Sequence, residues 1–465
     1  MCSHHQHKEN HEFAGEKKYR LADFFNMWWD DYVKNPAEFI EPEQYKAVNA
    51  IRVCRTEVLG VDYYACPDCG EVSEVRRNCK NRFCPTCSWK DTIEWSEKIK
   101  SQMFDLPHRH VVFTLPHQLN GLLKQNKKEI LNYLARNAAD TFKDWMKAKY
   151  NIKIGIIGVI HTFGEKKNLH SHIHMIVSWG GIDYKTGELM ELKGKKQEYV
   201  KYSFLQKKFR CKFEDELIAL FDSGEMNHNF ANRREFMRFV KKINNKNWQI
   251  HLEPPMECPA SVVRYIARYS KRACLSEYKI TNIEGEYISF RYKDYKDRNA
   301  KGKAIEKELK LHYRKFFPLL LQHVPPRYFR MVRYYGAYGR FKNIPDEYKA
   351  TEDEELLETI ETEYKQSPNN PKFCGACTKA KQYVYTVVDA RKKEERRETF
   401  DITKHKHIKY IKTIQSETKE SRKKLRKEIV YETLKSESKS VRKWLKKKKA
   451  RSEERRVGKE CATGC

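Results

Sequence analysis

Hydrophobic residues recur at helical spacing near the start of the chain. Between residues 19 and 59, apolar side chains three and four positions apart form two stripes, one from Leu21 to Trp28 and one from Tyr45 to Ile51. This spacing places side chains on one face of a helix. The pattern therefore predicts two helices whose apolar faces pack into a core.

Strand patterns dominate the next part of the chain. Residues 108–116, HRHVVFTLP, are rich in β-branched and aromatic side chains and end at a proline, and residues 119–149 are amphipathic with helical spacing. Two further apolar runs, residues 152–163 and 169–179, are joined by a short polar turn. These patterns predict a strand, a long helix and then a β-hairpin, with a second hairpin at residues 279–295.

Charge adds a partner to this picture. The chain of 465 residues has 93 Lys and Arg against 63 Asp and Glu, a formal net charge of +30, which indicates a polyanionic partner. With 40% hydrophobic residues the chain can still bury cores. Its apolar runs are far shorter than the ~18 residues of a membrane span, and its polar start is unlike a secretory signal. We therefore expect no membrane partner and a reducing compartment.

The C-terminal part is dominated by charge. Residues 390–450 hold 23 Lys and Arg against 9 Asp and Glu, so we expect a basic arm that is partly helical or disordered. A solvated tail without specific function and a phosphate-binding arm explain this composition equally well. The stretch RSEERRVGKEC at residues 451–461 resembles a translated sequencing-library adapter, and residues 451–465 are excluded from the fold prediction.

Cysteines gather between residues 66 and 87. Two CxxC pairs are separated by 14 residues, a zinc-ribbon spacing in which each turn offers two thiolates to one ion. The predicted ligands are Cys66, Cys69, Cys84 and Cys87, with Cys79 as a spare thiol or an alternative ligand. Four thiolates leave no open position, so the expected Zn²⁺ is structural. A further CxxC, Cys374 and Cys377, has no partner pair nearby in the sequence and is interpreted as a half-site.

Histidines alternate along the second strand of the predicted hairpin. Successive strand residues point to opposite faces, so His170, His172 and His174 share one face. His172 and His174 can bind one ion, and His161 on the preceding strand is the expected third ligand. The alternative is that these histidines are ordinary polar residues, but three of them on one face are costly to bury.

Two tyrosines are one helical turn apart. The segment CPASVVRYIARYSKRA, residues 258–273, predicts a helix that starts near a proline and carries Tyr265 and Tyr269 on one face. Basic residues on the adjacent face could contact phosphates, and they are Arg264, Arg268, Lys271 and Arg272. Taken alone, the spacing is more typical of tyrosines that pack against a sheet, and the histidine strand and the family resemblance below favour the catalytic interpretation.

These motifs together carry a family resemblance. His172-Ile173-His174 looks like the HUH motif (His, hydrophobic, His) of single-strand nucleases, and Phe113-Thr114-Leu115 resembles the strand motif that precedes it. With CRT at residues 54–56, VIHTFG at 159–164 and RYIARY at 264–269, the sequence resembles the insertion-sequence ninety-one family of rolling-circle transposases from about residue 22 to about residue 341.

The resemblance implies an enzyme that cleaves and rejoins single-stranded DNA through a 5′-phosphotyrosyl intermediate. Tyr265 and Tyr269 would be the nucleophiles, and Mg²⁺ or Mn²⁺ would be the catalytic ion. The partners would be single-stranded DNA at element ends and target, with a host helicase because the chain has no Walker A pattern. The expected location is the bacterial cytoplasm, at the nucleoid. Two alternatives are a rolling-circle replication initiator with the same chemistry and a non-catalytic zinc-ribbon DNA-binding regulator.

The predicted fold class is α+β. The N-terminal helices and zinc ribbon come first, followed by an antiparallel-sheet HUH nuclease domain with a helical insert and then by the basic C-terminal arm. The expected boundaries are 1–50 for the helical segment, 51–100 for the zinc ribbon, 101–345 for the catalytic domain with its insert at about 182–250, and 346–450 for a basic, partly disordered tail.

Overall fold

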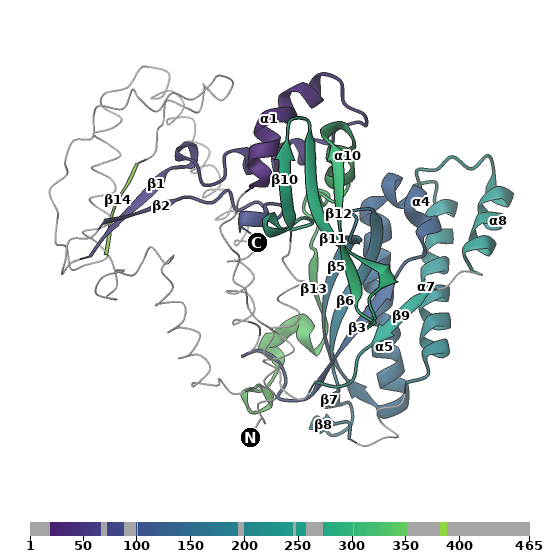
Figure 1. Cartoon of the computed structure of the whole chain (residues 1–465). Coiled ribbons are helices and arrows are strands. Elements are labelled where there is room, and N and C mark those ends of the chain that lie inside the picture. Colours follow the sequence, from purple (N-terminus) through teal and green to yellow (C-terminus); the bar gives the residue numbers. More distant parts are fainter. Residues whose placement is uncertain are drawn as a thin grey trace, which may run out of the picture. The chain divides into compact units, whose positions relative to one another are not determined.

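The chain forms helices and antiparallel sheets, which confirms the α+β class (Figure 1). The computed structural model describes residues 19–66, 72–87, 99, 101–193, 200–244, 248–256, 273–300, 302–350 and 382–387. All of these belong to one compact unit, residues 1–396. Within this described part of the chain, no helix is long and apolar enough to cross a membrane.

Two helices form where the apolar stripes predict them. α1 spans Leu21–Lys34 and α2 spans Pro42–Arg52. At the start of α1, the carboxylate of Asp23 accepts a hydrogen bond from the backbone N–H of Arg20, and Gln44 makes the equivalent bond at the start of α2. Such caps satisfy donors that the first helical turn leaves unpaired, which fixes where each helix begins.

A five-stranded antiparallel sheet contains the histidine strand. Its order is β13-β5-β6-β3-β9. The strands are β3 (His108–Thr114), β5 (Gly155–Phe163), β6 (Leu169–Ser178), β9 (Gln249–Leu252) and β13 (Val332–Gly336). β5 and β6 form the predicted hairpin, whereas β9 and β13 come from later in the chain and pair with β3 and β5.

One face of this sheet shares a large apolar core with four helices, as Figure 1 shows for α5 and α7. The helices are α4 (Asn120–Gln125), α5 (Lys127–Tyr150), α7 (Tyr202–Asp222) and α8 (Arg233–Asn244), and a short 3-10 turn (His117–Leu119) precedes α4. Phe113 of β3 and Ile173 of β6 point into this core. The region predicted as a helical insert thus contributes α7 and α8 to the same core as the sheet.

Among the described residues, a smaller core packs on part of the opposite face of the sheet. Ile157 of β5 and Ile176 of β6 lie opposite each other and pack with Phe104 and Tyr338. Tyr338 belongs to a 3-10 segment, η4 (Ala337–Asn343), that follows β13. Partly buried residues of β7 (Gly180–Asp183), β8 (Leu189–Glu191) and η5 (Asp346–Tyr348) pack against this core, and β4 (Ile152–Lys153) pairs with β7.

A third core joins the N-terminal helices to a later segment of the chain. That segment comprises η3 (Glu277–Lys279), the three-stranded sheet β10 (Ile280–Glu284), β11 (Tyr287–Arg298) and β12 (Ala304–His312), and α10 (Tyr313–Leu321). The rings of Phe24 and Phe25 lie 5.4–5.6 Å from those of Phe316 and Phe317, between centroids. Residues from two segments far apart in the sequence therefore share one apolar cluster.

A separate three-stranded sheet has the order β14-β1-β2. After a 3-10 turn, η1 (Glu57–Leu59), the strands β1 (Val61–Ala65) and β2 (Val72–Arg76) form a hairpin, and β14 (Gln382–Val387) pairs with β1. β14 falls inside the segment predicted as a basic, partly disordered tail. At least this part of the tail is folded against the N-terminal hairpin.

Candidate metal centres

Strand alternation separates the histidines of β6 from its apolar residues. Ile173 and Met175 point into the helix-covered core, so His172 and His174 lie on the other face. In the hairpin register, His161 of β5 lies directly opposite His172. The sheet thus brings together the three histidines that the sequence analysis selects as ligands.

The three histidines converge on one point. Each offers a ring nitrogen, and these nitrogens all lie within 4.8 Å of one another. The Nε2 atoms of His172 and His174 are 3.1 Å apart. The ring centroid of His161 is 4.8 Å from that of His174. Three convergent imidazole nitrogens are a donor set that fits one divalent cation and leaves positions for substrate oxygens.

A backbone carbonyl fixes the ring of His172. Its Nδ1 lies 2.8 Å from the carbonyl oxygen of His170, and a carbonyl can only accept, so Nδ1 carries the proton. The Nε2 lone pair of His172 then faces His174. The ring of His170 is exposed on the same face of the sheet and does not belong to the converging group. His170 contributes to the centre through its backbone carbonyl.

Burial keeps the rings of His172 and His174 neutral. Removal from water, together with the neighbouring ring of His161, lowers the pKa of His172 to about 3. The same two causes lower the pKa of His174. Since neutral imidazole is the form that binds metal ions, the rings are in the binding form at neutral pH.

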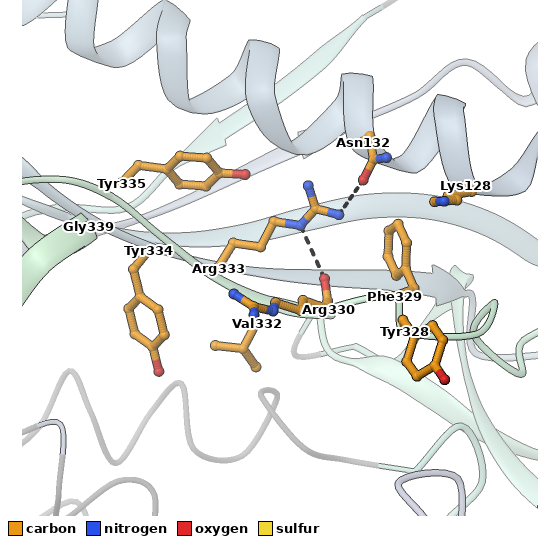
Figure 2. Close-up of a pocket in the computed structure, with 10 residues that line it drawn as sticks. All are labelled: Lys128, Asn132, Tyr328, Phe329, Arg330, Val332, Arg333, Tyr334, Tyr335 and Gly339. Atoms are coloured by element: carbon orange, nitrogen blue, oxygen red, sulfur yellow. Dashed lines mark hydrogen bonds between the residues drawn. The ribbon is translucent and has the colours of Figure 1, made fainter. Parts of the chain in front are cut away.

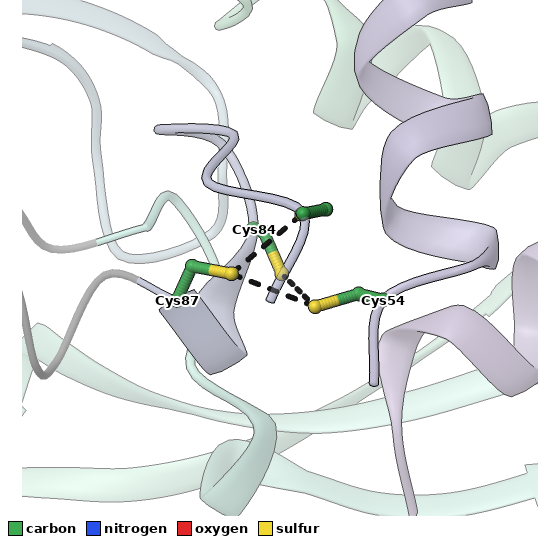
Figure 3. A group of neighbouring side chains, drawn as sticks. Cys54, Cys84 and Cys87 are labelled. Atoms are coloured by element: carbon green, nitrogen blue, oxygen red, sulfur yellow. Dashed lines mark hydrogen bonds between the residues drawn. The ribbon is translucent and has the colours of Figure 1, made fainter. Parts of the chain in front are cut away.

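Four cysteines form a second group, shown in part in Figure 3. Cys54, Cys79, Cys84 and Cys87 place their sulfur atoms within 4.8 Å of one another. Sγ of Cys87 is 3.5 Å from that of Cys54 and 3.6 Å from that of Cys79. A tetrahedral zinc site with Zn–S bonds of about 2.3 Å has sulfur–sulfur edges of about 3.8 Å, so the group has nearly the size that a zinc ion needs.

This group differs from the ligand set expected from the CxxC spacing. Cys84 and Cys87 are joined by Cys79 and by Cys54, which the spacing argument did not select; Cys66 is not in the group, and Cys69 lies outside the described residues. The reason is the hairpin between the two CxxC pairs. β1 and β2 have five residues each. At about 3.4 Å per residue, the base of the hairpin is about 14 Å from its tip.

Cys66 follows the far end of this hairpin, whereas Cys54 and Cys79 flank its base. The backbone N–H of Arg55 donates to the carbonyl of Arg77, 3.1 Å away, which ties the two flanks together. The signal in the sequence was the CRT motif at Cys54. The number of thiols was a second signal. The sequence has five cysteines in this cluster and one zinc ion needs four, so at least one of the five is not a ligand.

Local turns aim the cysteines at one another. Asn81 accepts hydrogen bonds at its side chain from the N–H of Phe83 and at its carbonyl from the N–H of Cys84, so the chain turns just before the second CxxC. Arg20 donates to the carbonyl of Cys54 at 2.8 Å. Cys54, Cys84 and Cys87 are also part of the apolar cluster of α1, α2 and α10, so a zinc ion here would hold a core together.

Tyr265 and Tyr269 lie outside the described residues, and so do the four basic residues on the adjacent face, Arg264, Arg268, Lys271 and Arg272. The described chain stops at Met256, whose backbone pairs with His108 beside the sheet, and resumes at Ala273.

A basic and aromatic groove runs along β13, at an edge of the same sheet (Figure 2). Its volume is about 460 Å³. The lining residues that could contact a nucleic acid are Lys128, Asn132, Tyr328, Phe329, Arg330 and Arg333. Arg333 lies over the ring of Phe329 at 4.8 Å, and Tyr328 is 86% exposed. Rings beside cations are the combination that single-strand grooves use.

Two family models match the chain, one over each metal centre. The model described as "Transposase zinc-binding domain" matches residues 24–115, which include the four clustered cysteines. The model described as "Putative transposase" matches residues 155–344, which include the three clustered histidines.

Two curated proteins are similar over most of their length. One is "Putative transposase y4qJ" of Sinorhizobium fredii, 28% identical over 69% of this chain and 80% of its own. The other is "Transposase for insertion sequence element IS801" of Pseudomonas savastanoi pv. phaseolicola, 28% identical over 63% of this chain and 70% of its own. No solved structure matches the chain.

Proposed function

Since the chain belongs to the insertion-sequence ninety-one family of transposases, we propose that it cuts and rejoins single-stranded DNA in rolling-circle transposition. The observation that supports this most is the group of three convergent histidine rings on one face of a β-hairpin. Such a group suits an ion that acts on a phosphate, because it leaves coordination positions open for oxygen ligands.

Tyr265 and Tyr269 are the proposed nucleophiles. The phenolic oxygen of one tyrosine attacks the scissile phosphorus, and the bond from phosphorus to the 3′ oxygen breaks. The tyrosine proton ends on the departing 3′ oxygen, which becomes a hydroxyl, and the 5′ end stays attached as a phosphotyrosine. Attack by a 3′ hydroxyl reverses the step, so strands can be rejoined without nucleotide hydrolysis.

His161, His172 and His174 are the proposed ligands of the catalytic ion. When bound there, a divalent cation would polarise the phosphate and stabilise the charge that develops on it. Mg²⁺ takes oxygen ligands almost exclusively, whereas imidazole binds transition metals, so this donor set favours Mn²⁺ over Mg²⁺. The cysteine group would hold a structural Zn²⁺, since four thiolates complete its coordination.

The proposed DNA surface combines the groove along β13 with the basic residues of the tyrosine segment. Strand separation would be left to a host helicase. These activities would place the protein in the bacterial cytoplasm, at the nucleoid.

A labelled single-stranded oligonucleotide that contains an element end tests this function. We expect a protein–DNA adduct that survives a denaturing gel, and no adduct from a Tyr265→Phe, Tyr269→Phe double variant. Tyr184→Phe, at an exposed tyrosine, is the matched control. An adduct from the double variant would place the nucleophile elsewhere. Cleavage at a replication origin instead of at element ends would favour a replication initiator.

The histidines are tested in the same assay. His172→Ala with His174→Ala should abolish the adduct but leave single-strand binding within a few-fold, because affinity comes mainly from the basic surface. A folded variant that loses binding as completely as cleavage would contradict a purely catalytic role.

A further inference from the structure

The Nε2 of His174 faces His172, and a line of polar side chains begins at its other ring nitrogen, Nδ1. The Nδ1 of His174 lies 2.9 Å from Nε2 of His110, which is on the neighbouring strand β3. Nδ1 of His110 lies 3.3 Å from a carboxylate oxygen of Glu253, just after β9. The side chain of His110 is only 3% exposed, and the backbone N–H of Glu253 donates to the carbonyl of His110 at 2.9 Å.

The protons along this line can be arranged in two ways when both rings are neutral. In one, His174 is protonated on Nε2, and its Nδ1 accepts a hydrogen bond from the Nε2–H of His110. Nδ1 of His110 would then present a lone pair to the carboxylate of Glu253, which is repulsive. In the other, His110 donates to Glu253 and His174 donates to His110, so every N–H meets an acceptor.

The second arrangement frees the Nε2 lone pair of His174. The Nε2 of His172 already presents a lone pair, because its Nδ1 donates to the carbonyl of His170. Two lone pairs 3.1 Å apart repel each other unless a cation lies beside both. Glu253 therefore selects the proton arrangement that suits a metal ion and disfavours the one that suits an empty site.

We propose that His110 and Glu253 are positioning residues that fix His174 in its metal-binding form. This rests on the proposed function only in placing a metal ion at the histidine group. Partners of this kind orient metal-ligating histidines and increase their basicity, and their loss typically lowers metal affinity by about 10–100-fold.

Mn²⁺ affinity of the full-length, zinc-loaded chain, measured by electron paramagnetic resonance of free Mn²⁺, tests this proposal. Glu253→Leu should weaken Mn²⁺ binding about 10-fold or more. Glu253→Gln should stay within a few-fold of wild type, because its amide oxygen still accepts from His110. His251→Ala is the matched control, since this 70% exposed histidine also contacts Glu253, at 3.8 Å, but does not lie between Glu253 and His174.

Unchanged Mn²⁺ affinity in Glu253→Leu, or equal loss in Glu253→Gln, would overturn the proposal. A wild-type chain that does not bind Mn²⁺ would overturn it too. The adduct assay is read separately. If wild type binds Mn²⁺ and Glu253→Leu weakens it, but no adduct forms, the positioning role stands and the proposed DNA cleavage fails.

Discussion

Two buried histidines outside the metal centre are held by neutral hydrogen bonds. His108 contacts the carbonyl of Leu106 and the hydroxyl of Tyr338, both at 2.7 Å. His323 contacts the hydroxyl of Thr162 at 3.0 Å and the carbonyl of Lys167 at 2.8 Å. Burial lowers the pKa of His108 to about 4 and that of His323 to about 3.

These lowered pKa values predict acid sensitivity. An unfolded histidine takes up a proton below about pH 6.5, whereas the folded His323 does not until about pH 3, so its contribution to stability is complete above pH 6.5 and is lost as the pH falls. Between pH 6.5 and 5 this loss is about 2 kcal/mol. Urea unfolding should show wild type losing about that much more stability than His323→Gln over this range. Parallel curves would show that His323 titrates normally in the folded chain.

The placement of side chains was predictable where a strict period governs it. The alternation of a strand has a period of two, so the sequence alone selects His161, His172 and His174 for one face once the hairpin is recognised. The cysteines follow no such period. Cys54 lies beside Cys79 because the hairpin brings their two chain segments together. The number of residues between the CxxC pairs does not reveal how far the hairpin separates its base from its tip.

At the scale of elements, α7 is the helix that most clearly joins the predicted insert to the sheet. The ring of Phe209 lies 4.8 Å from that of Phe113 on β3 and 5.5 Å from that of Trp248 before β9, between centroids. Phe204, one and a half turns earlier on the same helix, is 46% exposed. The helix is thus anchored in the core along one face.

This packing predicts that the insert cannot be removed without loss of the sheet. Phe209→Ala leaves a cavity against two aromatic rings and should lower the free energy of unfolding by about 3–5 kcal/mol. Phe204→Ala should change it by less than about 0.5 kcal/mol, as an exposed substitution on the same helix. Denaturant unfolding measures both. A small effect of Phe209→Ala would mean that α7 contributes little to the core that it shares with the sheet.

Elements were more predictable than their partners. Apolar periodicity gave α1, α2, α5 and the β5–β6 hairpin, because each is determined by neighbours in sequence. Periodicity did not predict that β9 pairs with β3 or that β14 pairs with β1. These pairings depend on the burial of surfaces that are far apart in the sequence. The third core, in which Phe24 meets Phe316, is likewise a contact between segments far apart in sequence.

At the scale of the whole molecule, the main feature for DNA binding is the excess of positive charge. The net charge of +30 is spread over a folded part, with Arg330 and Arg333 in the groove along β13, and the basic arm at residues 390–450. These two regions should contribute differently to DNA binding. A groove with rings beside its cations favours bases that are free to stack, whereas a highly charged arm neutralises phosphates in any strand.

The arm is therefore expected to determine most of the salt dependence of binding. Each phosphate contact with single-stranded DNA releases condensed counterions and adds about 0.7 to the slope of log affinity against log salt concentration. Truncation after Ala390 should lower that slope by several such contacts, yet keep the preference for single over double strands. Arg330→Gln with Arg333→Gln should lower the slope by only about 1–2 and reduce that preference.

A neutral Gly/Ser segment in place of the arm controls for chain length. Fluorescence anisotropy with single- and double-stranded oligonucleotides, over a range of salt concentrations, gives both quantities. An unchanged slope after truncation would mean that the arm is a solvated tail that does not contact DNA. The positive charge that acts on the substrate would then belong to the folded part, where the groove and the tyrosine segment are its proposed locations.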